Sequence, residues 1–347
     1  ASDVYKRQVF VEKEKCMRRP FARALMAVIT AFSVGCGLHA APAGAAPAEE
    51  ASPVAHLVGK RWIGKQLLEV KVYSPSMKRV ITNQVMTPRG MKRAPVFYLL
   101  SGMYGGDGDQ WAHPASGARG FFKDKDVYVV NPMGAASTYY TDWYRKDRVL
   151  GYKPMWETYL SKELPPVINH TLNTTGRNAI GGYSMSAGTA LALLANHGDV
   201  FKAGASYSGC PVSSNLPMKM VTMNSMILNT PGVNPLNAYA GLISPAWIHN
   251  DPALHMSQLR GKPIFISAST GKPKMPPDDH DMRKQPDYSL LEQNIYLCTA
   301  LFRGMADAAG VKYEFFNQPY GAHSFGQFGQ AMRKSWPMIA RALHTAI

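Results

Sequence analysis

The stretch Asn178-Ala179-Ile180-Gly181-Gly182-Tyr183-Ser184-Met185-Ser186-Ala187-Gly188 predicts the fold of this chain. An apolar run ends in small residues, presents Ser184, and continues into an apolar segment at 189–194. This order is typical of a strand, a sharp turn with the serine at its tip, and a helix. Such a turn needs small neighbours, and Gly182 and Ser186 lie two residues to either side of the serine. The alternative is an ordinary turn in which Ser184 only caps the helix.

Apolar runs alternate with helical patterns along the rest of the chain. We expect strands at 66–73, 79–86, 95–100, 126–130, 179–180, 203–207, 263–268 and 312–316. We expect helices at 156–172, 186–197, 288–309 and 324–346. Alternating strands and helices indicate a mostly parallel sheet that is covered on both faces. Together with the serine turn, the pattern predicts an α/β-hydrolase fold with a sheet of about eight strands.

The first part of the chain is typical of an export signal. Residues 1–16 are charged and precede a natural-looking start, so we expect a non-native or mis-called leader. Residues 17–48 have a basic start, an apolar centre and Ala46-Pro47-Ala48, as a secretory signal peptide does. We expect a short linker at 49–60, followed by a single catalytic domain within 49–347. Residues 216–252 show no clear period and are interpreted as an insertion at the carboxyl edge of the sheet.

Composition narrows the class of protein. A hydrophobic share of 46% with 18% charged residues indicates a globular chain. The net charge is +15, and removing residues 1–48 leaves 31 bases and 20 acids, about +11. That balance suits an anionic cell envelope or polyanionic glycans, although a merely basic soluble surface is the simpler explanation. No basic helix, zinc spacing or RNA-binding aromatic motif points to nucleic acid.

The four cysteines divide into two pairs. Cys16 and Cys36 lie in the leader and signal. Cys210 and Cys298 remain, and in an oxidising compartment an even pair predicts one disulfide. Two buried free thiols are the alternative. The Cys/His spacing suggests no metal site, and we expect no cofactor.

A serine nucleophile needs a histidine base and an acid that orients the histidine. In this fold the chain order is serine, acid, histidine. His323 is the expected base, because it lies between the last predicted strand and the last predicted helix. Position alone leaves the acid open among four residues: Asp278, Asp279 and Asp281, which follow the 263–268 strand, and Glu292 further on.

An oxyanion hole in this fold uses two backbone N–H groups. One belongs to the residue after the nucleophile, which is Met185. The other comes from the loop after an early central strand, here 99–106, whose glycines allow close approach of the backbone. We expect Met103 to provide that second donor.

Several segments together resemble the secreted mycolyltransferases of mycobacteria and corynebacteria, the antigen 85 group within the esterase-D-like α/β-hydrolases. The resemblance runs in order from about residue 60 to 335 and is carried by Leu100-Ser101-Gly102-Met103, Tyr140-Thr141-Asp142-Trp143-Tyr144, Trp156-Glu157-Thr158-Tyr159-Leu160, Gly182-Tyr183-Ser184-Met185, Trp247-Ile248-His249-Asn250-Asp251-Pro252, Leu291-Glu292-Gln293 and Ala322-His323-Ser324. The run at 181–186, with Ser208-Gly209-Cys210-Pro211 downstream, resembles the corynebacterial branch most.

The resemblance implies Ser184 as nucleophile, His323 as base and Glu292 as acid. It also implies Met103 and Met185 as the oxyanion donors. The implied reaction is ping-pong: the serine takes a mycoloyl chain from trehalose monomycolate. It then passes the chain to a second trehalose monomycolate or to cell-wall arabinogalactan. The implied place of action is the envelope of a mycolic-acid bacterium, without stable membrane insertion once the signal is removed.

Sugar contacts are expected at three positions. The family often has aspartate where this chain has Ser101, and tryptophan where it has Phe325. Trp143 offers an aromatic face, as do Tyr140 and Trp111, unless these rings belong to the core. A sugar hydroxyl held near the ester can outcompete water, since orientation is worth effective molarities of about 10⁵ M or more. A secreted carboxylesterase using water and a binding protein without turnover remain the alternative functions.

Overall fold

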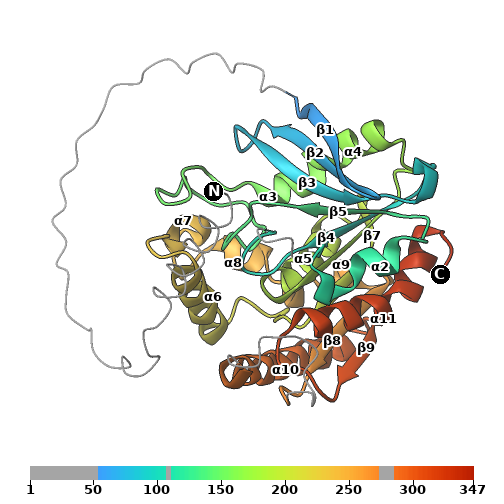
Figure 1. Cartoon of the computed structure of the whole chain (residues 1–347). Helices are drawn as coiled ribbons and strands as arrows, with labels where there is room; N and C mark the ends of the chain where they lie inside the picture. The colour runs from blue at the N-terminus through green and yellow to red at the C-terminus, as the bar shows by residue number, and fades with distance from the viewer. Residues whose placement is uncertain (1–53, 107–110, 273–284) are drawn as a thin grey trace, which may run out of the picture. The chain divides into compact units, whose positions relative to one another are not determined.

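A nine-stranded sheet runs through the protein, as seen in the computed structural model, which describes residues 54–106, 111–272 and 285–347 (Figure 1). The strands are β1 (His56–Gly64), β2 (Leu67–Ser74), β3 (Arg79–Met86), β4 (Val96–Leu100), β5 (Tyr128–Pro132), β6 (Asn178–Tyr183), β7 (Phe201–Tyr207), β8 (Ile264–Ser269) and β9 (Glu314–Gln318). Their order across the sheet is β1-β2-β3-β5-β4-β6-β7-β8-β9.

Strand direction divides the sheet into two parts. The β1–β2, β2–β3 and β3–β5 pairs are antiparallel. From β5 through β4 to β9, every neighbouring pair is parallel. An antiparallel edge followed by a parallel run with this crossed β5-β4 order is the arrangement of an α/β-hydrolase, so the predicted fold is confirmed.

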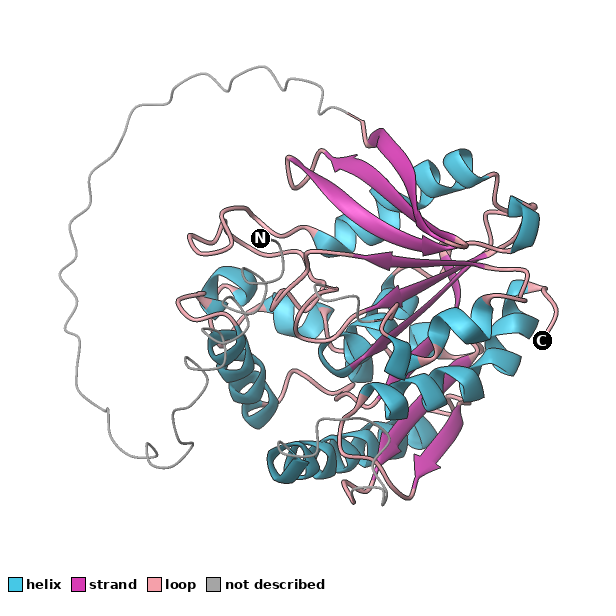
Figure 2. Cartoon of the chain, in the orientation of Figure 1, coloured by secondary structure: helices cyan, strands magenta, loops and turns pink. Residues whose placement is uncertain are grey.

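Helices cover both faces of the sheet (Figure 2). The helices are α2 (Ala118–Phe122), α3 (Trp156–Thr158), a π-helical turn (Tyr159–Glu163), α4 (Leu164–Leu172), α5 (Ala187–Asn196), α6 (Leu216–Asn229), α7 (Pro235–Tyr239), α8 (Pro245–His249), α9 (Met256–Leu259), α10 (Gln285–Ala308) and α11 (Phe325–Leu343). Short 3₁₀ turns lie at Arg89–Met91, Pro114–Ser116, Ser184–Ser186 and Pro252–Leu254.

The alternation of side chains along β4 shows why its sequence is apolar throughout. Val96, Tyr98 and Leu100 join a core with residues of α4, α5 and α10. Phe97 and Leu99, which point the other way, join a second core with residues of α2 and α11. Every residue of β4 is buried, because successive side chains of a strand face opposite layers and both layers are covered.

One expectation about organisation needs correction. The segment 49–60 is not wholly a linker, because β1 begins at His56. Most residues of β1 are exposed on both faces of an edge strand, so the sequence carries no apolar alternation there. The segment 216–252 contains α6, α7 and α8, which pack on a small core of their own. No helix in the described part of the chain is long and apolar enough to cross a membrane.

Candidate active site

Ser184 lies at the sharp turn between β6 and α5. Its φ of 55° is in the left-handed region, which a side chain adopts only where the surroundings hold it. A Cβ on Gly182 would lie 2.5 Å from Ser186 Oγ, and one on Gly209 would lie 2.3 Å from the carbonyl oxygen of Ser184. The absence of these two side chains therefore allows the chain to turn so tightly, and the turn presents the serine hydroxyl.

His323 meets this hydroxyl from the loop between β9 and α11. Its Nε2 lies 2.8 Å from Ser184 Oγ, and its Nδ1 lies 2.7 Å from Glu292 Oε2. A carboxylate can only accept hydrogen bonds, so Nδ1 carries the proton and Nε2 is free to accept from the serine. His323 has a φ of 60°, and its side chain is 8% exposed. The structure thus brings these three sequence-predicted residues into one hydrogen-bonded chain.

Glu292 is held on all sides within α10. Its side chain is fully buried, and Oε1 accepts hydrogen bonds from the backbone N–H of Ser269 at 2.9 Å and from Gln327 Nε2 at 2.7 Å. A buried carboxylate needs such donors. This geometry favours Glu292 among the four acids that position left open. Asp278, Asp279 and Asp281 lie outside the described residues.

Gln327 is a residue of the site that sequence reasoning missed. From the first turn of α11, its Oε1 accepts from the backbone N–H of His323 at 2.9 Å. Its Nε2 donates to Glu292 and, at 2.6 Å, to Ser208 Oγ. One amide therefore fixes the acid and the backbone of the base. The only available sequence signal is its position four residues after His323.

The loop expected to complete the oxyanion hole is braced by the insertion. Asn229 of α6 donates to Met103 O at 3.2 Å and to Ser137 Oγ at 2.9 Å, and the N–H of Ser137 also donates to Met103 O. A Cβ on Gly102 would lie 2.6 Å from the Tyr183 ring. On the other side, Met185 lies in the first turn of a helix, where backbone N–H groups have no partner within the helix.

Of the three expected sugar contacts, Ser101 and Trp143 are buried and only Phe325 is partly exposed. Ser101 is fully buried, and its Oγ accepts from Asn131 Nδ2 at 2.9 Å. Trp143 is 1% exposed and belongs to the core of the insertion, while Trp111 and Tyr140 are also buried. These rings offer no open face, because each fills a core. Phe325 is partly exposed and stacks on His113 with ring centroids 5.1 Å apart.

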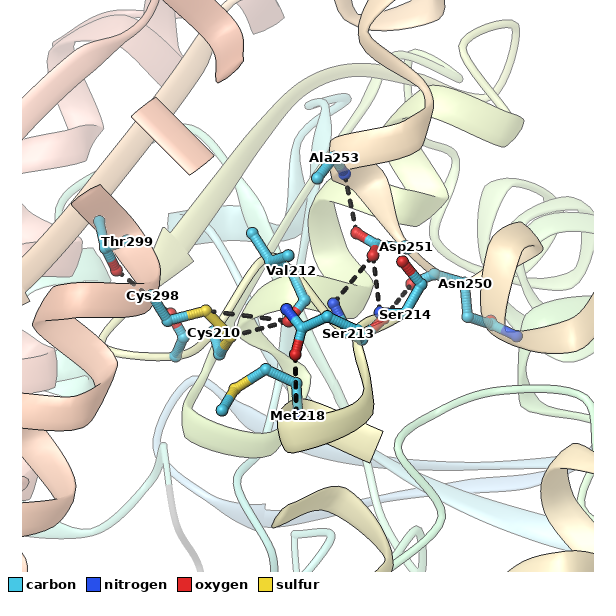
Figure 3. The surroundings of a disulfide bond; sticks show 12 residues. Cys210, Val212, Ser213, Ser214, Met218, Asn250, Asp251, Ala253, Cys298 and Thr299 are labelled. Atoms are coloured by element: carbon cyan, nitrogen blue, oxygen red, sulfur yellow. Dashed lines mark hydrogen bonds between the residues drawn. A yellow bond between two sulfur atoms is a disulfide. The ribbon is translucent and has the colours of Figure 1, made fainter. Parts of the chain in front are cut away.

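The predicted disulfide is present (Figure 3). It joins Cys210, which follows β7, to Cys298 of α10, with Cα atoms 5.3 Å apart. Nearby, Asp251 accepts hydrogen bonds from the N–H groups of Ser213 and Ser214, so the same loop is tied to the end of the insertion. The bridge connects the support of the serine turn with the helix that carries Glu292.

A second cluster of titratable groups lies at the far end of the serine helix. Glu157 of α3 lies 2.7 Å from His197 Nε2, just beyond α5, and 2.8 Å from His249 Nε2 of α8. Burial raises the pKa of Glu157, but hydrogen bonds from both histidines outweigh it and lower the pKa to about 2. The hydrogen bond between His249 and Glu157 in turn raises the pKa of His249. The cluster joins the insertion to the core.

In the described ranges 54–106, 111–272 and 285–347, no group of three or more histidine, cysteine or carboxylate side chains is arranged to hold a metal ion.

The chain is similar to known proteins in sequence and in fold. The sequence model of the family described as "Putative esterase" matches residues 74–337. The diacylglycerol acyltransferase/mycolyltransferase Ag85C of Mycobacterium avium is 30% identical over 344 residues, covering 96% of this chain and 92% of that relative. Ag85A of Mycobacterium tuberculosis is 28% identical over 283 residues, covering 79% and 80%. The crystal structure of Mycobacterium tuberculosis MPT51 (FbpC1) has the same fold, with a TM-score of 0.65 and 23% identity over 78% of this chain and 96% of that one.

Proposed function

Because this chain belongs to the esterase family and, within it, to the diacylglycerol acyltransferase/mycolyltransferase group, we propose that it is a serine-dependent mycolyltransferase. The donor is trehalose monomycolate. The acceptor is a second trehalose monomycolate or the arabinogalactan of the cell wall. The observation that carries the proposal is the hydrogen-bonded chain from Ser184 Oγ through His323 to Glu292.

The first half of the reaction forms an acyl-enzyme. His323 Nε2 takes the proton of Ser184 while the serine oxygen bonds to the ester carbonyl carbon. The backbone N–H groups of Met103 and Met185 stabilise the oxyanion that develops. When the ester C–O bond breaks, the imidazolium returns its proton to the departing oxygen of trehalose. Glu292 holds the imidazole in the right tautomer and stabilises its positive charge.

The second half transfers the acyl group. A sugar hydroxyl of the acceptor gives its proton to His323 Nε2 while its oxygen bonds to the acyl carbon. When the bond between that carbon and Ser184 Oγ breaks, the imidazolium returns the proton to Ser184 Oγ, which restores the free enzyme. Water competes for the same carbon, and the enzyme is an esterase if water wins. Orientation of the sugar decides this competition. Phe325 and His113, which are stacked and partly open to solvent near the triad, are the aromatic surface best placed to orient it.

The test is the purified protein with trehalose monomycolate as the only lipid. Formation of trehalose dimycolate supports transfer, whereas release of free mycolic acid alone supports the esterase. A fluorophosphonate probe should label Ser184, and Ser184→Ala should abolish both labelling and turnover, with a loss on the order of 10⁴-fold or more. A Ser184→Ala protein with near-normal rate would refute the mechanism.

The proposal includes export. In this proposal residues 17–48 are a secretory signal, and 49–347 form one catalytic domain that acts in the cell envelope. Mass spectrometry of the protein recovered outside the cell tests this, because cleavage after Ala48 would leave Glu49 as the first residue.

A further inference from the structure

The outward face of α6 is apolar where a solvent-facing helix is normally polar. Seven residues of α6 are exposed, and six of them are apolar: Leu216, Pro217, Met220, Val221, Ile227 and Leu228. At 3.6 residues per turn they lie within an arc of roughly 140°. The seventh is Asn224. The inward side carries the polar Thr222, Ser225 and Asn229 beside the methionines that pack on the cores, so the outward side has no fewer apolar residues than the buried side.

The apolar surface continues onto the loop between α7 and α8. Ile243 is 99% exposed, and Leu242 beside it is 39% exposed. The loop adjoins α6, because Lys219 Nζ donates to the carbonyl oxygen of Leu242 at 3.0 Å. Lys219 is the only lysine, arginine or carboxylate between residues 213 and 250. An exposed apolar surface of this extent marks an interaction site.

A basic loop borders this surface. Arg145, Lys146 and Arg148 are exposed, and none of them pairs with a carboxylate in the part of the chain that the structure describes. The loop runs along α7, since the N–H groups of Tyr144 and Arg145 donate to Ala238 O and Asn237 O.

The acids of this loop do not neutralise its bases. Asp147 is 1% exposed, and its carboxylate accepts from the N–H groups of Val149, Leu150 and Asn234. Asp142 is partly buried and accepts two hydrogen bonds from Thr158. The surface beside α7 therefore carries positive charge, and Tyr144 adds an exposed aromatic ring.

We propose that the apolar face of α6, the tip at Ile243 and the basic loop at 144–149 together dock the enzyme on an anionic lipid surface. Apolar side chains flanked by bases and an aromatic ring are the signature of an element that lies in a membrane interface without crossing it. The charge of the surface distinguishes two partners that it could bind. A second copy of this chain would bring two sets of the same unpaired bases together, whereas anionic lipid headgroups would neutralise them.

The helix that carries the apolar face also contacts the loop expected to hold the oxyanion. The last turn of α6 contacts the oxyanion loop through Asn229, and the adjoining Thr230 shares a 2.8 Å hydrogen bond with Ser137. α6 to α8 lie together at the end of the molecule away from α2 (Figure 1). The docking surface and the catalytic groups are thus joined by the insertion, although docking itself needs no catalysis.

The experiment measures co-sedimentation of the purified protein with two kinds of vesicle. One kind contains phosphatidylcholine alone, and the other also contains about 30% of the anionic lipid phosphatidylglycerol. We expect binding to the anionic vesicles only, weakened by high salt. R145Q/K146Q/R148Q should lower partitioning roughly 100-fold, since each base near an anionic surface is worth about fivefold. Ile243→Asp and Leu228→Asp should each lower it at least about tenfold.

Matched controls separate the site from bulk charge and bulk hydrophobicity. K60Q/K65Q/K78Q removes three exposed bases near the β1 edge and should leave partitioning nearly unchanged. Leu301→Asp alters an equally exposed leucine on α10 and should do the same. Ser184→Ala should bind vesicles normally, and the docking variants should hydrolyse a water-soluble short-chain ester normally, so this test does not depend on the proposed function.

Three results would overturn the proposal. The first is equal sedimentation with both vesicle types or with neither. The second is loss of binding in Leu301→Asp while Leu228→Asp binds normally. The third is a stable dimer in solution that Leu228→Asp dissociates, without vesicle binding, which would assign the face to a second copy of the chain.

Discussion

Removing the Cys210–Cys298 bridge, in the variant C210A/C298A, should both destabilise the protein and impair its catalysis. The bridge closes a loop of 88 residues. In the chain-entropy treatment, cross-linking a loop of that length restricts the unfolded chain by about 4.6 kcal/mol at 25 °C. A folded body of about 280 residues has an unfolding entropy of about 0.6 kcal/mol/K, so the melting temperature should fall by about 8 °C.

The catalytic effect follows from what the bridge joins. Cys298 lies on α10 six residues after Glu292, and Cys210 directly follows Gly209, which packs against the carbonyl of Ser184. Without the bridge, the acid and the serine turn are connected only by non-covalent packing. We expect kcat for a soluble ester to fall roughly tenfold or more at 25 °C while the protein is still folded, because small displacements of reacting groups are costly.

The assay is thermal unfolding by circular dichroism with ester hydrolysis on the same samples. Wild-type protein treated with dithiothreitol should move towards the variant in both measurements, and the variant itself should not respond. A melting temperature within about 2 °C of wild type would refute the loop-entropy reasoning. Unchanged kcat in the folded variant would show that the bridge does not position the triad.

Three further predictions concern Glu292, Gln327 and Glu157. Glu292→Gln should lower kcat on the order of 10⁴-fold, because an amide no longer enforces the Nδ1-protonated tautomer of His323, and labelling by a fluorophosphonate should slow in parallel. Gln327→Leu should lower kcat about 10- to 100-fold with little change in KM, whereas Gln330→Leu, one turn further along α11, should not; equal effects would show a general loss of helix stability. Glu157→Gln should lower the free energy of unfolding by about 3 kcal/mol near pH 6. The pKa of Glu157 is about 2 in the folded protein and near its ordinary value of 4.5 in the unfolded chain, so the carboxylate stabilises the fold above pH 4.5. This stabilisation is lost as the pH falls towards 2. The raised pKa of His249 stabilises the folded state below the pKa that His249 has in the unfolded chain, and this stabilisation is lost as the pH rises through the pKa of the folded state. The free energy of unfolding, measured with urea from pH 2 to 8, should therefore vary less with pH in Glu157→Gln than in the wild type. A pH profile parallel to that of the wild type would contradict the role of the cluster.

The family resemblance and the fold class were readable from the sequence, and both are confirmed. Each depended on local patterns. The doubly buried strands are apolar at every position, and the serine turn requires small residues on both sides, so neither needs knowledge of a distant contact. The even pair Cys210 and Cys298 likewise predicted a disulfide that is present. The edge strand β1 was missed for the opposite reason: its exposed residues show no pattern.

The tertiary structure decided which side chains are buried and which hydrogen bonds they make. The partners of Glu292 come from β8 and α11, so its position in the chain did not distinguish it from the nearby aspartates, and the family resemblance was needed to single it out. Neither the position nor the resemblance revealed Gln327. Trp143 and Ser101 are the same residue types whether they line a sugar site or fill a core, and only packing places them in the interior. The sequence by itself determined the strands, the turn and the chemical kinds of group available; long-range packing determined their distances, burial and partners, because these depend on residues that no single stretch of chain contains.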